Sequence, residues 1–363
     1  MMRTSAVLSR DPRAGFTVET VDIDEPRAGE ILVRIAAAGV CHTDLVSRRA
    51  GAGDRPVLLG HEGAGVVEAV GPGVSAVRPG DHVVLTFRHC GGCANCRAGR
   101  PAYCRRANAL NQFGRRAHDQ PRVTVDGVPV LDGFFGQSSF AGYALAAEDN
   151  TVVIDSAIDL ALAAPFGCGF QTGMGAVLNV LRPEPGSWLA IYGAGAVGMA
   201  ALLAARTMAD VRVAVVETSA ARRELARELG ADAAIDPAES PTTPAIRELT
   251  GGGATHALDT TGVASVLGDA VAALTTGATV VAVGLGAGTP PVDVSDIVLY
   301  GKVIRGCLEG DAVPSTFIPH LLDLHKRGLL PADRLITRYP HTGIDRALED
   351  QRAGRVVKPV LTW

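Results

Sequence analysis

Four of the chain's seven cysteines lie within fifteen consecutive positions, in the stretch CGGCANCRAGRPAYC that runs from residue 90 to residue 104. The four are Cys90, Cys93, Cys96 and Cys104, spaced as C-x2-C-x2-C-x7-C. Four thiolates at this spacing can close a tetrahedron around Zn²⁺ and leave no open position, which is typical of a structural zinc site. An iron–sulfur cluster uses the same type of ligand, but no partner cofactor motif supports it. The spacing therefore predicts a structural zinc lobe.

A catalytic zinc needs a different set of ligands, usually three protein groups that mix thiolate with imidazole and leave a fourth position free. Candidates are Cys41 in GVCHTD, His61 in GHEGAGVVEAVG and Cys168 in APFGCGFQTG, each in a glycine-flanked segment. Two thiolates and a neutral imidazole would leave the site about neutral with the metal, so a substrate oxygen there would be strongly polarised. Taken singly, each residue is more often a buried cysteine or histidine of the core. Spacing alone cannot join ligands this far apart.

A glycine-rich turn, GAGAVG, lies between the strand-like SWLAIY and the helix-like MAALLAARTMA. Gly193 and Gly195 would let the backbone turn and approach a pyrophosphate at the helix N-terminus, and Gly198 would permit close packing of helix on sheet. The alternative is a purely structural strand–turn–helix unit. In this context the turn predicts a dinucleotide site.

An acidic residue follows the glycine turn at the distance expected for ribose recognition. Glu217 ends the run VAVVE, nineteen residues beyond Gly198. A carboxylate there would bind the adenosine ribose 2′-hydroxyl and repel a 2′-phosphate, which predicts NAD rather than NADP. Arg222 and Arg223 lie close behind it and could weaken that preference.

The elements that must position these residues change along the chain. Short β-branched runs punctuated by glycine, such as residues 30–40, 64–73 and 81–87, predict a mostly β first half. From about residue 186 strands alternate with helical stretches, which predicts a parallel sheet covered by helices. After about residue 300 the alternation fades, and the strand-like tail RVVKPVLTW is expected to return to the first domain.

Composition bounds the class of protein. The 363 residues are 47% hydrophobic and 20% charged, enough for a sizeable core and two domains. A formal net charge of -4 gives no basic field for nucleic acid. This charge fits a small-molecule partner better. The start lacks an apolar secretory core, and the apolar stretch 157–181 is interrupted by Asp159, Pro165 and Gln171, so no membrane segment is expected. Seven cysteines, an odd number with four of them bunched, argue against a disulfide framework and for metal binding in a reducing compartment, so a cytoplasmic location is expected.

Taken in order, GVCHTD, GHEGAGVVEAVG, the four-cysteine lobe, GCGFQTG and GAGAVG resemble the zinc-dependent alcohol dehydrogenases of the medium-chain dehydrogenase/reductase superfamily, nearly end to end. Residues 134–145, 164–181 and 301–324 are most similar to the benzyl, or aryl, alcohol dehydrogenase branch. The resemblance implies an α/β fold, in which a GroES-like, mostly β catalytic domain is interrupted by a Rossmann domain with a doubly wound parallel sheet. The expected boundaries are 1–169, with the zinc lobe at about 88–106, then 170–299, then a return over 300–363. It also implies a homodimer or homotetramer.

For the metal, the resemblance implies that Cys41, His61 and Cys168 bind the catalytic zinc, with Glu62 beside it as a candidate transient ligand. Asp44 would orient the imidazole of His61. The expected cofactors are therefore NAD and two zinc ions per chain, one catalytic and one structural.

For the reaction, the resemblance implies that Thr43 accepts the alcohol proton. His42 and Lys358 would lie near the cofactor pyrophosphate, Thr172 would pack against the nicotinamide, and Gly284 would lie close to the cofactor. Some relatives carry a histidine three residues after the relay hydroxyl, where this chain has Val46. The proton is therefore expected to leave through ribose hydroxyls, His42 and water. Cys307 matches no motif and is interpreted as an ordinary buried residue.

The expected activity is reversible NAD-linked oxidation of a primary alcohol, aryl or allylic, such as benzyl alcohol, to its aldehyde. One alternative is a related zinc dehydrogenase acting on a polyol or on a formaldehyde–thiol adduct, because the same fold allows many substrates. Another is a non-catalytic NAD-binding redox sensor. The intact set of Cys41, Thr43, His61 and Cys168 argues against the sensor.

Overall fold

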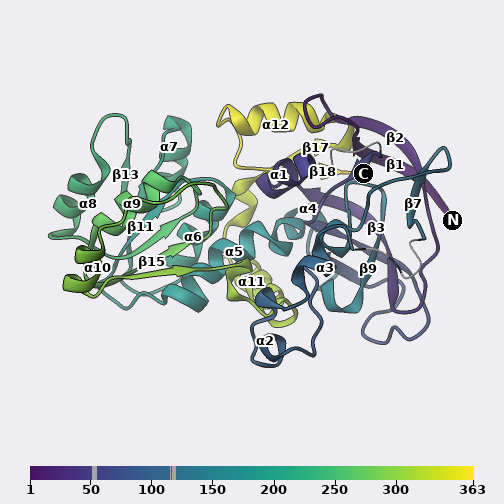
Figure 1. Cartoon of the computed structure of the whole chain (residues 1–363), viewed down its shortest axis with the longest axis horizontal. Coiled ribbons are helices and arrows are strands. Elements are labelled where there is room, and N and C mark those ends of the chain that lie inside the picture. Colours follow the sequence, from purple (N-terminus) through teal and green to yellow (C-terminus); the bar gives the residue numbers. More distant parts are fainter. Residues whose placement is uncertain (51–54, 115, 117–119) are drawn as a thin grey trace. The chain divides into compact units, whose positions relative to one another are not determined.

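The computed structural model describes residues 1–50, 55–114, 116 and 120–363. The chain forms two compact units, whose elements Figure 1 labels. Unit 1 contains Met1–Cys168, Val313–Asp323 and Ile336–Trp363, and unit 2 contains Gly169–Ala312 and Leu324–Leu335. The chain therefore leaves unit 1 directly after Cys168, returns to it at Val313, and crosses to unit 2 once more over Leu324–Leu335 before it ends in unit 1.

Unit 1 is mostly β. Its first sheet has the order β4-β1-β2-β7-β8. These strands are β1 (Met2–Ser9), β2 (Thr17–Ile23), β4 (Val57–Leu58), β7 (Val123–Val125) and β8 (Val128–Pro129). Its second sheet has the order β10-β6-β5-β3-β18-β17, with β9 also paired to β3. These strands are β3 (Glu30–Gly39), β5 (Gly63–Val70), β6 (His82–Leu85), β9 (Tyr143–Ala147), β10 (Thr151–Val153), β17 (Ile336–Pro340) and β18 (Lys358–Thr362).

The centre of the second sheet explains why β3 is so apolar. It pairs antiparallel with β5, β9 and β18, so its ILVRIAAAG run is buried at most positions. Strand β18 comes from the far end of the chain, with Val360 opposite Gly39. The helices of unit 1 are short: α1 (His42–Ala50), α2 (Ala94–Arg97), α3 (Ala107–Asn111), α4 (Leu160–Ala163) and α12 (Ile344–Arg352).

Unit 2 contains a six-stranded sheet in which every neighbouring pair is parallel, in the order β13-β12-β11-β14-β15-β16. In chain order this is 3-2-1-4-5-6, the arrangement of dinucleotide-binding folds, and ligands bind where the order reverses, beyond the carboxyl ends of β11 and β14. The strands are β11 (Trp188–Tyr192), β12 (Arg212–Val216), β13 (Ala233–Ile235), β14 (Ala254–Asp259), β15 (Leu274–Ala282) and β16 (Val303–Gly306). The predicted Rossmann sheet is confirmed.

Helices connect the parallel strands, as this topology requires. The first strand, WLAIY, is buried at every position because helices cover both faces of the sheet. The helices are α5 (Gly169–Gly175), α6 (Ala196–Arg206), α7 (Ala220–Glu228), α8 (Thr242–Thr250), α9 (Ala264–Ala272) and α10 (Val294–Tyr300), with α11 (Pro314–Lys326) passing from unit 1 into unit 2.

The apolar helices of the described residues are short or bent. No single helix there is long and apolar enough to cross a bilayer. Only the adjacent pair Leu160–Gly167 and Gly169–Leu181, taken together and bent between them, has the length and composition.

Candidate functional site

Four side chains from three distant segments meet in unit 1. The ligand atoms of Cys41, His61, Glu62 and Cys168 all lie within 4.8 Å of one another. Cys41 follows β3, His61 and Glu62 precede β5, and Cys168 follows the turn of 3₁₀-helix at Ala164–Gly167. The antiparallel pairing of β3 with β5 brings the first two segments together. We call these four residues the metal group.

A buried carboxylate fixes the metal group from behind. Asp44 is fully buried, and its Oδ1 accepts a hydrogen bond from His61 Nδ1 at 2.9 Å and from the amide of Gly60 at 3.1 Å. Its Oδ2 accepts from the amide of Cys41 at 3.0 Å. One carboxylate therefore fixes the tautomer of the His61 imidazole and also holds the backbone of Cys41 in position.

The other ring nitrogen of His61 is the observation that a metal would explain. Nε2 is buried and has no hydrogen-bond partner within the part of the chain that the structure describes. It lies among two sulfurs and a carboxylate, a donor set that suits a catalytic zinc. Cys41, His61 and Cys168 therefore fit the metal for which the sequence proposed them.

The charges in the metal group favour the deprotonated sulfur that a metal binds. A hydrogen bond with Cys168 and the charges of His61 and Lys358 hold the pKa of Cys41 well below its usual value, against the effect of burial. Burial would lower the pKa of His61, but Asp44 and Cys41 raise it well above its usual value. Both shifts favour negative charge on the sulfur of Cys41 and positive charge beside it, which is the charge pattern that a divalent cation would complete.

Lys358 forms an ion pair with Glu62 of the metal group. Its ammonium is buried, 2.5 Å from Glu62 Oε2 and 3.1 Å from the carbonyl oxygen of Val40. Burial alone would lower the pKa of Lys358, but Glu62 raises it. A Cβ at Gly39 would overlap the Glu62 carboxylate, so this glycine makes room for the pair. The structure thus gives Lys358 a partner within the metal group.

The four-cysteine lobe forms a second, separate sulfur group. Its Sγ atoms lie within 4.8 Å of one another, and those of Cys93 and Cys96 are 3.5 Å apart. With zinc–sulfur bonds of about 2.3 Å, the edge of a tetrahedron is about 3.8 Å, so the spacing suits a zinc ion. The amides of Cys90 and Arg106 each lie 3.3 Å from the Sγ of Cys104.

Local backbone also prepares the lobe for a metal. Cys93 stands at the N-terminus of α2, and the backbone amide of Arg105, with that of Cys96, lowers the pKa of its thiol to about 6. The lobe lies near the surface, with only Cys104 buried, and all seven cysteines are free thiols. Four sulfurs with no imidazole or carboxylate among them favour a structural role.

The glycine turn after β11 has the shape of a phosphate-binding loop. Gly193 has φ +92°, and a Cβ at Gly198 would overlap the carbonyl oxygen of Gly193, so both positions need glycine. Gly195 differs, because nothing lies within 4 Å of the place where its Cβ would be. Open space thus stands in front of the N-terminus of α6, as a bound pyrophosphate would require.

Glu217 holds this turn in place. It is buried after β12, and its carboxylate accepts hydrogen bonds from the amides of Ala194 at 2.7 Å and Ser219 at 2.8 Å. Arg223 donates to the carbonyl oxygen of Glu217 and pairs with Asp236 at 2.6 Å. The guanidinium of Arg223 is therefore engaged by Asp236 and by the backbone of Glu217.

The remaining candidates lie in both units. The hydroxyl of Thr43 is 3.7 Å from Cys41 Sγ. His42 is exposed at the start of α1, and Val46 on the same helix is 48% exposed. Thr172 is half-buried on α5. Two further positions belong to unit 2: Gly284, where a Cβ would overlap the backbone of Gly262, and Cys307, whose burial raises its pKa to about 12.

Sequence reasoning missed two neighbours of His61. Gln137 is buried, donates to the carbonyl oxygens of His61 and Thr86 at 2.9 and 3.1 Å, and accepts from the amide of Gly63 at 3.1 Å. The ring of Phe135, at φ +51°, lies 4.6 Å from the imidazole. The polar residues Gln137, Ser138 and Ser139 within the aromatic run FFGQSSF were the available signal.

Comparison with known proteins agrees with this geometry. Residues 27–156 match the family "Alcohol dehydrogenase GroES-like domain", and residues 196–327 match "Zinc-binding dehydrogenase". The chain is 48% identical to geraniol dehydrogenase of Castellaniella defragrans over 363 residues, covering 99% of this chain and 97% of that one.

Solved structures show the same similarity. An alcohol dehydrogenase zinc-binding domain protein from Burkholderia ambifaria is 45% identical with a TM-score of 0.96, over 99% of both chains. Benzyl alcohol dehydrogenase from Acinetobacter calcoaceticus is 38% identical with a TM-score of 0.95, over 100% of this chain and 99% of that one. The resemblance found in the sequence is confirmed: the chain belongs to the zinc-dependent alcohol dehydrogenases, and it is an enzyme of that family.

Proposed function

We propose that the protein catalyses the reversible, NAD-linked oxidation of a primary aryl or allylic alcohol to its aldehyde. The observation that carries the proposal is the metal group, in which two sulfurs surround an imidazole nitrogen that has no hydrogen-bond partner among the described residues. Cys41, His61 and Cys168 would hold the zinc. When bound, the ion supplies Lewis-acid polarisation of the alcohol oxygen.

The chain's own residues supply orientation and the proton path. Asp44 holds the imidazole in one tautomer, and Gln137 braces the backbone of His61. Thr43 lies beside Cys41 and would accept the alcohol proton. His42, exposed next to Thr43, would pass the proton on to solvent in place of a histidine at position 46. His42 thus serves as the outer acceptor of the relay.

Aromatic surroundings support an aryl or allylic substrate over a polyol. Phe135 packs on His61, and Phe134 meets the same ring edge-on at 5.4 Å. A flat, conjugated substituent would gain contact with the partly exposed ring of Phe135, whereas a polyol would leave its hydroxyls without partners there. Geraniol dehydrogenase, an allylic-alcohol enzyme by its name, and benzyl alcohol dehydrogenase, an aryl one, support the same substrate class.

The nucleotide loop supports NAD. Open space at Gly195 would admit a pyrophosphate, and the buried carboxylate of Glu217 would repel a 2′-phosphate. A matched pair of variants tests this loop. Gly195→Ala should weaken NADH binding at least about tenfold with little change in melting temperature, because only the ligand needs that space. Gly198→Ala should lower the melting temperature itself, because its Cβ meets the backbone of Gly193. Equal effects of the two variants on melting temperature would contradict the assignment.

Initial rates of NADH formation test the activity. Benzyl alcohol, geraniol and a hexitol would each be supplied with NAD and with NADP, at equal concentrations. We expect fast turnover of the first two with NAD and slow turnover of the hexitol. A faster hexitol rate would replace this proposal with a polyol dehydrogenase, and a faster rate with NADP would overturn the role of Glu217.

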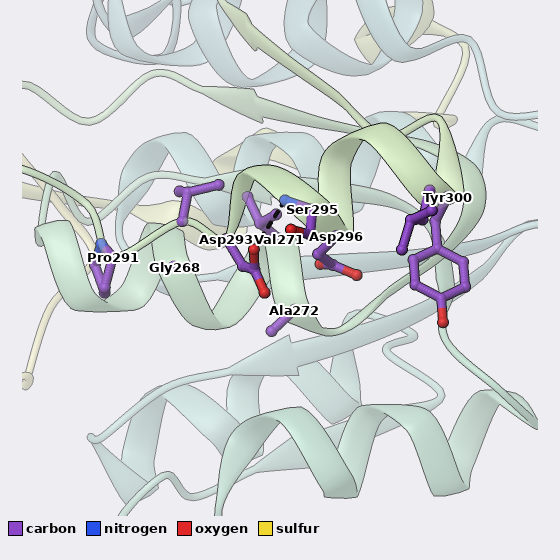
Figure 2. A pocket seen from close by; sticks show the side chains of 10 residues that line it. Gly268, Val271, Ala272, Pro291, Asp293, Ser295, Asp296 and Tyr300 are labelled. Atoms are coloured by element: carbon purple, nitrogen blue, oxygen red, sulfur yellow. Dashed lines mark hydrogen bonds between the residues drawn. The ribbon is translucent and has the colours of Figure 1, made fainter.

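An exposed apolar face supports a homodimer or homotetramer. On α10, Val294, Val298 and Leu299 are 71%, 72% and 76% exposed, and both Val303 and Ile304 of the edge strand β16 are exposed. Between α9 and α10 lies a hollow of ≈ 390 Å³, which Figure 2 shows with Val271, Pro291 and Tyr300 at its wall. An apolar face beside an open sheet edge fits a second copy of this chain.

Leu299→Glu tests the oligomer, because a charge on this face should release monomers in light scattering after size exclusion. An unchanged mass for that variant would contradict the assignment of this face. A cytoplasmic location is part of the same proposal, and retention of all protein in the soluble cell fraction would support it.

A further inference from the structure

Three consecutive residues after β16 adopt left-handed backbone conformations. The φ values are +51° at Glu309, +70° at Gly310 and +49° at Asp311. Residues with a Cβ avoid this region, and such strain persists only where the surroundings fix it. Strained backbone of this kind gathers where a fold holds a functional group in place. We call residues 309–311 the strained turn. Its conformation indicates that the surrounding structure uses it to hold a group in place.

Its contacts are with α5, within unit 2. Glu309 is 7% exposed, and its Oε2 accepts a hydrogen bond at 3.1 Å from the Nε2 of Gln171, which is fully buried. A Cβ at Gly310 would overlap the carbonyl oxygen of Gln171, and a Cβ at Gly175 would overlap that of Gly310. Asn179 donates to the same Gly310 oxygen at 3.0 Å. Turn and helix thus meet backbone to backbone, with no room for either to slide.

The other end of the strained turn is fixed to the sheet. Arg305, on β16, pairs with Asp311 at 2.6 Å. A buried carboxylate is costly unless it is hydrogen-bonded, so Glu309 is poorly explained as filler for the core. The strained turn therefore links β16, through the Arg305–Asp311 pair, to α5, through the buried hydrogen bond between Gln171 and Glu309.

The first turn of helix α5 lies next to two candidate site residues, one at each of its ends. It begins at Gly169, the residue bonded to Cys168, and it carries Thr172 next to Gln171. The helix continues into a π-helical turn at Ala176–Leu181, a rare form that often marks functional sites. A displacement of α5 would move Thr172 and strain the backbone of Cys168.

We propose that Glu309 is a positioning residue, which through Gln171 fixes α5 so that Thr172 meets the nicotinamide ring of the bound cofactor. This inference rests on the proposed NAD-linked function. It adds a buried carboxylate, distant in sequence from every motif of the site, to the residues that determine how the reacting end of the cofactor is held.

Two ligands separate this role from general stability. NADH carries the nicotinamide, and ADP-ribose lacks it but keeps the adenosine and pyrophosphate. Glu309→Ala retains a Cβ in the left-handed region and removes the carboxylate together with one methylene. We expect calorimetry to give about ten- to a hundredfold weaker binding of NADH, the value of one hydrogen bond to a charged group, and ADP-ribose binding within about twofold of the wild type.

Matched variants complete the test. Glu309→Gln keeps an acceptor for Gln171 Nε2 and should restore NADH binding. Gln171→Met removes the same hydrogen bond from the helix side at similar volume, and it carries the test if Glu309→Ala fails to fold. The effects of Glu309→Ala and Gln171→Met should not add in the double variant, because they break one contact.

The outcomes are distinct. Equal weakening of NADH and ADP-ribose, or no change in either, would overturn the positioning role of Glu309. A wild-type protein that binds neither ligand would instead overturn the proposed NAD-linked function. Wild-type binding of both ligands without the expected split in Glu309→Ala would leave that function standing and remove this inference alone.

Discussion

The two cysteine groups use the same ligand atom in opposite settings. The lobe draws its four sulfurs from fifteen consecutive residues near the surface, and backbone amides are the main neighbours of those sulfurs. The metal group draws its atoms from three segments that are spread over more than a hundred residues of the chain. Three of its four residues are buried. A short loop can therefore build the first, whereas the second exists only once the sheet of β3 and β5 has formed.

The groups that contact the two sets of ligands also differ: they are backbone amides in the lobe and charged side chains in the metal group. In the lobe, amides from positions 90, 105 and 106 stabilise thiolates, and no carboxylate joins them in the described chain. In the metal group, Asp44 serves His61 and Lys358 serves Glu62. The comparison teaches that a structural site can rely on backbone amides around its sulfurs, while a reactive one also needs each ligand fixed and tuned by a side chain behind it.

The largest expected effect is on turnover, from a change in the metal group. Cys168→Ala should lower kcat by about a thousandfold or more, because the activating ion contributes several kcal/mol to the transition state. Zinc content should fall by one ion per chain while the melting temperature changes little. Metal analysis and steady-state rates check this, with Cys307→Ala as the control for loss of a buried thiol. A folded Cys168→Ala protein with near-full turnover would show that the metal group is assigned wrongly.

Asp44→Asn should have the next largest effect. The asparagine amide would present a donor to one of three groups that already donate, namely His61 Nδ1 and the amides of Gly60 and Cys41. We expect kcat/KM and zinc affinity to fall about 10- to 100-fold. The matched control is Asp159→Asn, a carboxylate that also accepts a backbone amide but lies half-exposed at the start of α4. Similar losses in both variants would show that buried support behind the ligand is unimportant.

A change in the lobe should act on stability instead. Cys96→Ala removes one of four sulfurs and should release that zinc, which lowers the melting temperature by at least about 10 °C because metal binding there is folding free energy. At a temperature where the variant stays folded, turnover per remaining zinc should be close to the wild-type value. Calorimetry and rates on the same sample measure both. A loss of turnover as large as that of Cys168→Ala would erase the distinction between the two groups.

The sequence predicted these two groups to different depths, for a physical reason. The lobe could be predicted from the cysteine spacing because its ligands are close in sequence. The glycine turn with Glu217 could be predicted because strand, turn and helix follow one another in the chain. The metal group depended on a family resemblance. Lys358 shows the limit: its contact with Glu62 depends on β18 pairing with β3 more than three hundred residues away in the chain. Gln137 and the Glu309–Gln171 contact depend on tertiary packing in the same way, and no periodic pattern records them.

The smallest expected effect concerns the support of β18, and it depends on pH. Asp350 on α12 accepts hydrogen bonds from Tyr339, Arg346 and Arg355, just before the strand that begins with Lys358. The hydroxyl of Tyr339, then Arg355 and Arg346, lower the pKa of Asp350 from 3.8 to about 2. Because the folded pKa is depressed, the stability that this carboxylate contributes is present above about pH 4 and is lost as the pH falls toward 2.

Asp350→Asn should therefore melt slightly below the wild type at pH 7, and the gap should close between about pH 4 and pH 2. Turnover at pH 7 should stay near the wild-type value, since the network lies behind Lys358 and apart from the ligands themselves. Melting curves across that range measure the gap. A constant gap would mean that the carboxylate contributes through shape rather than charge. A strong loss of turnover would mean that the metal group depends on contacts that reach through β18 as far as Asp350. The lobe, by comparison, is contacted mainly by backbone amides close to it in sequence.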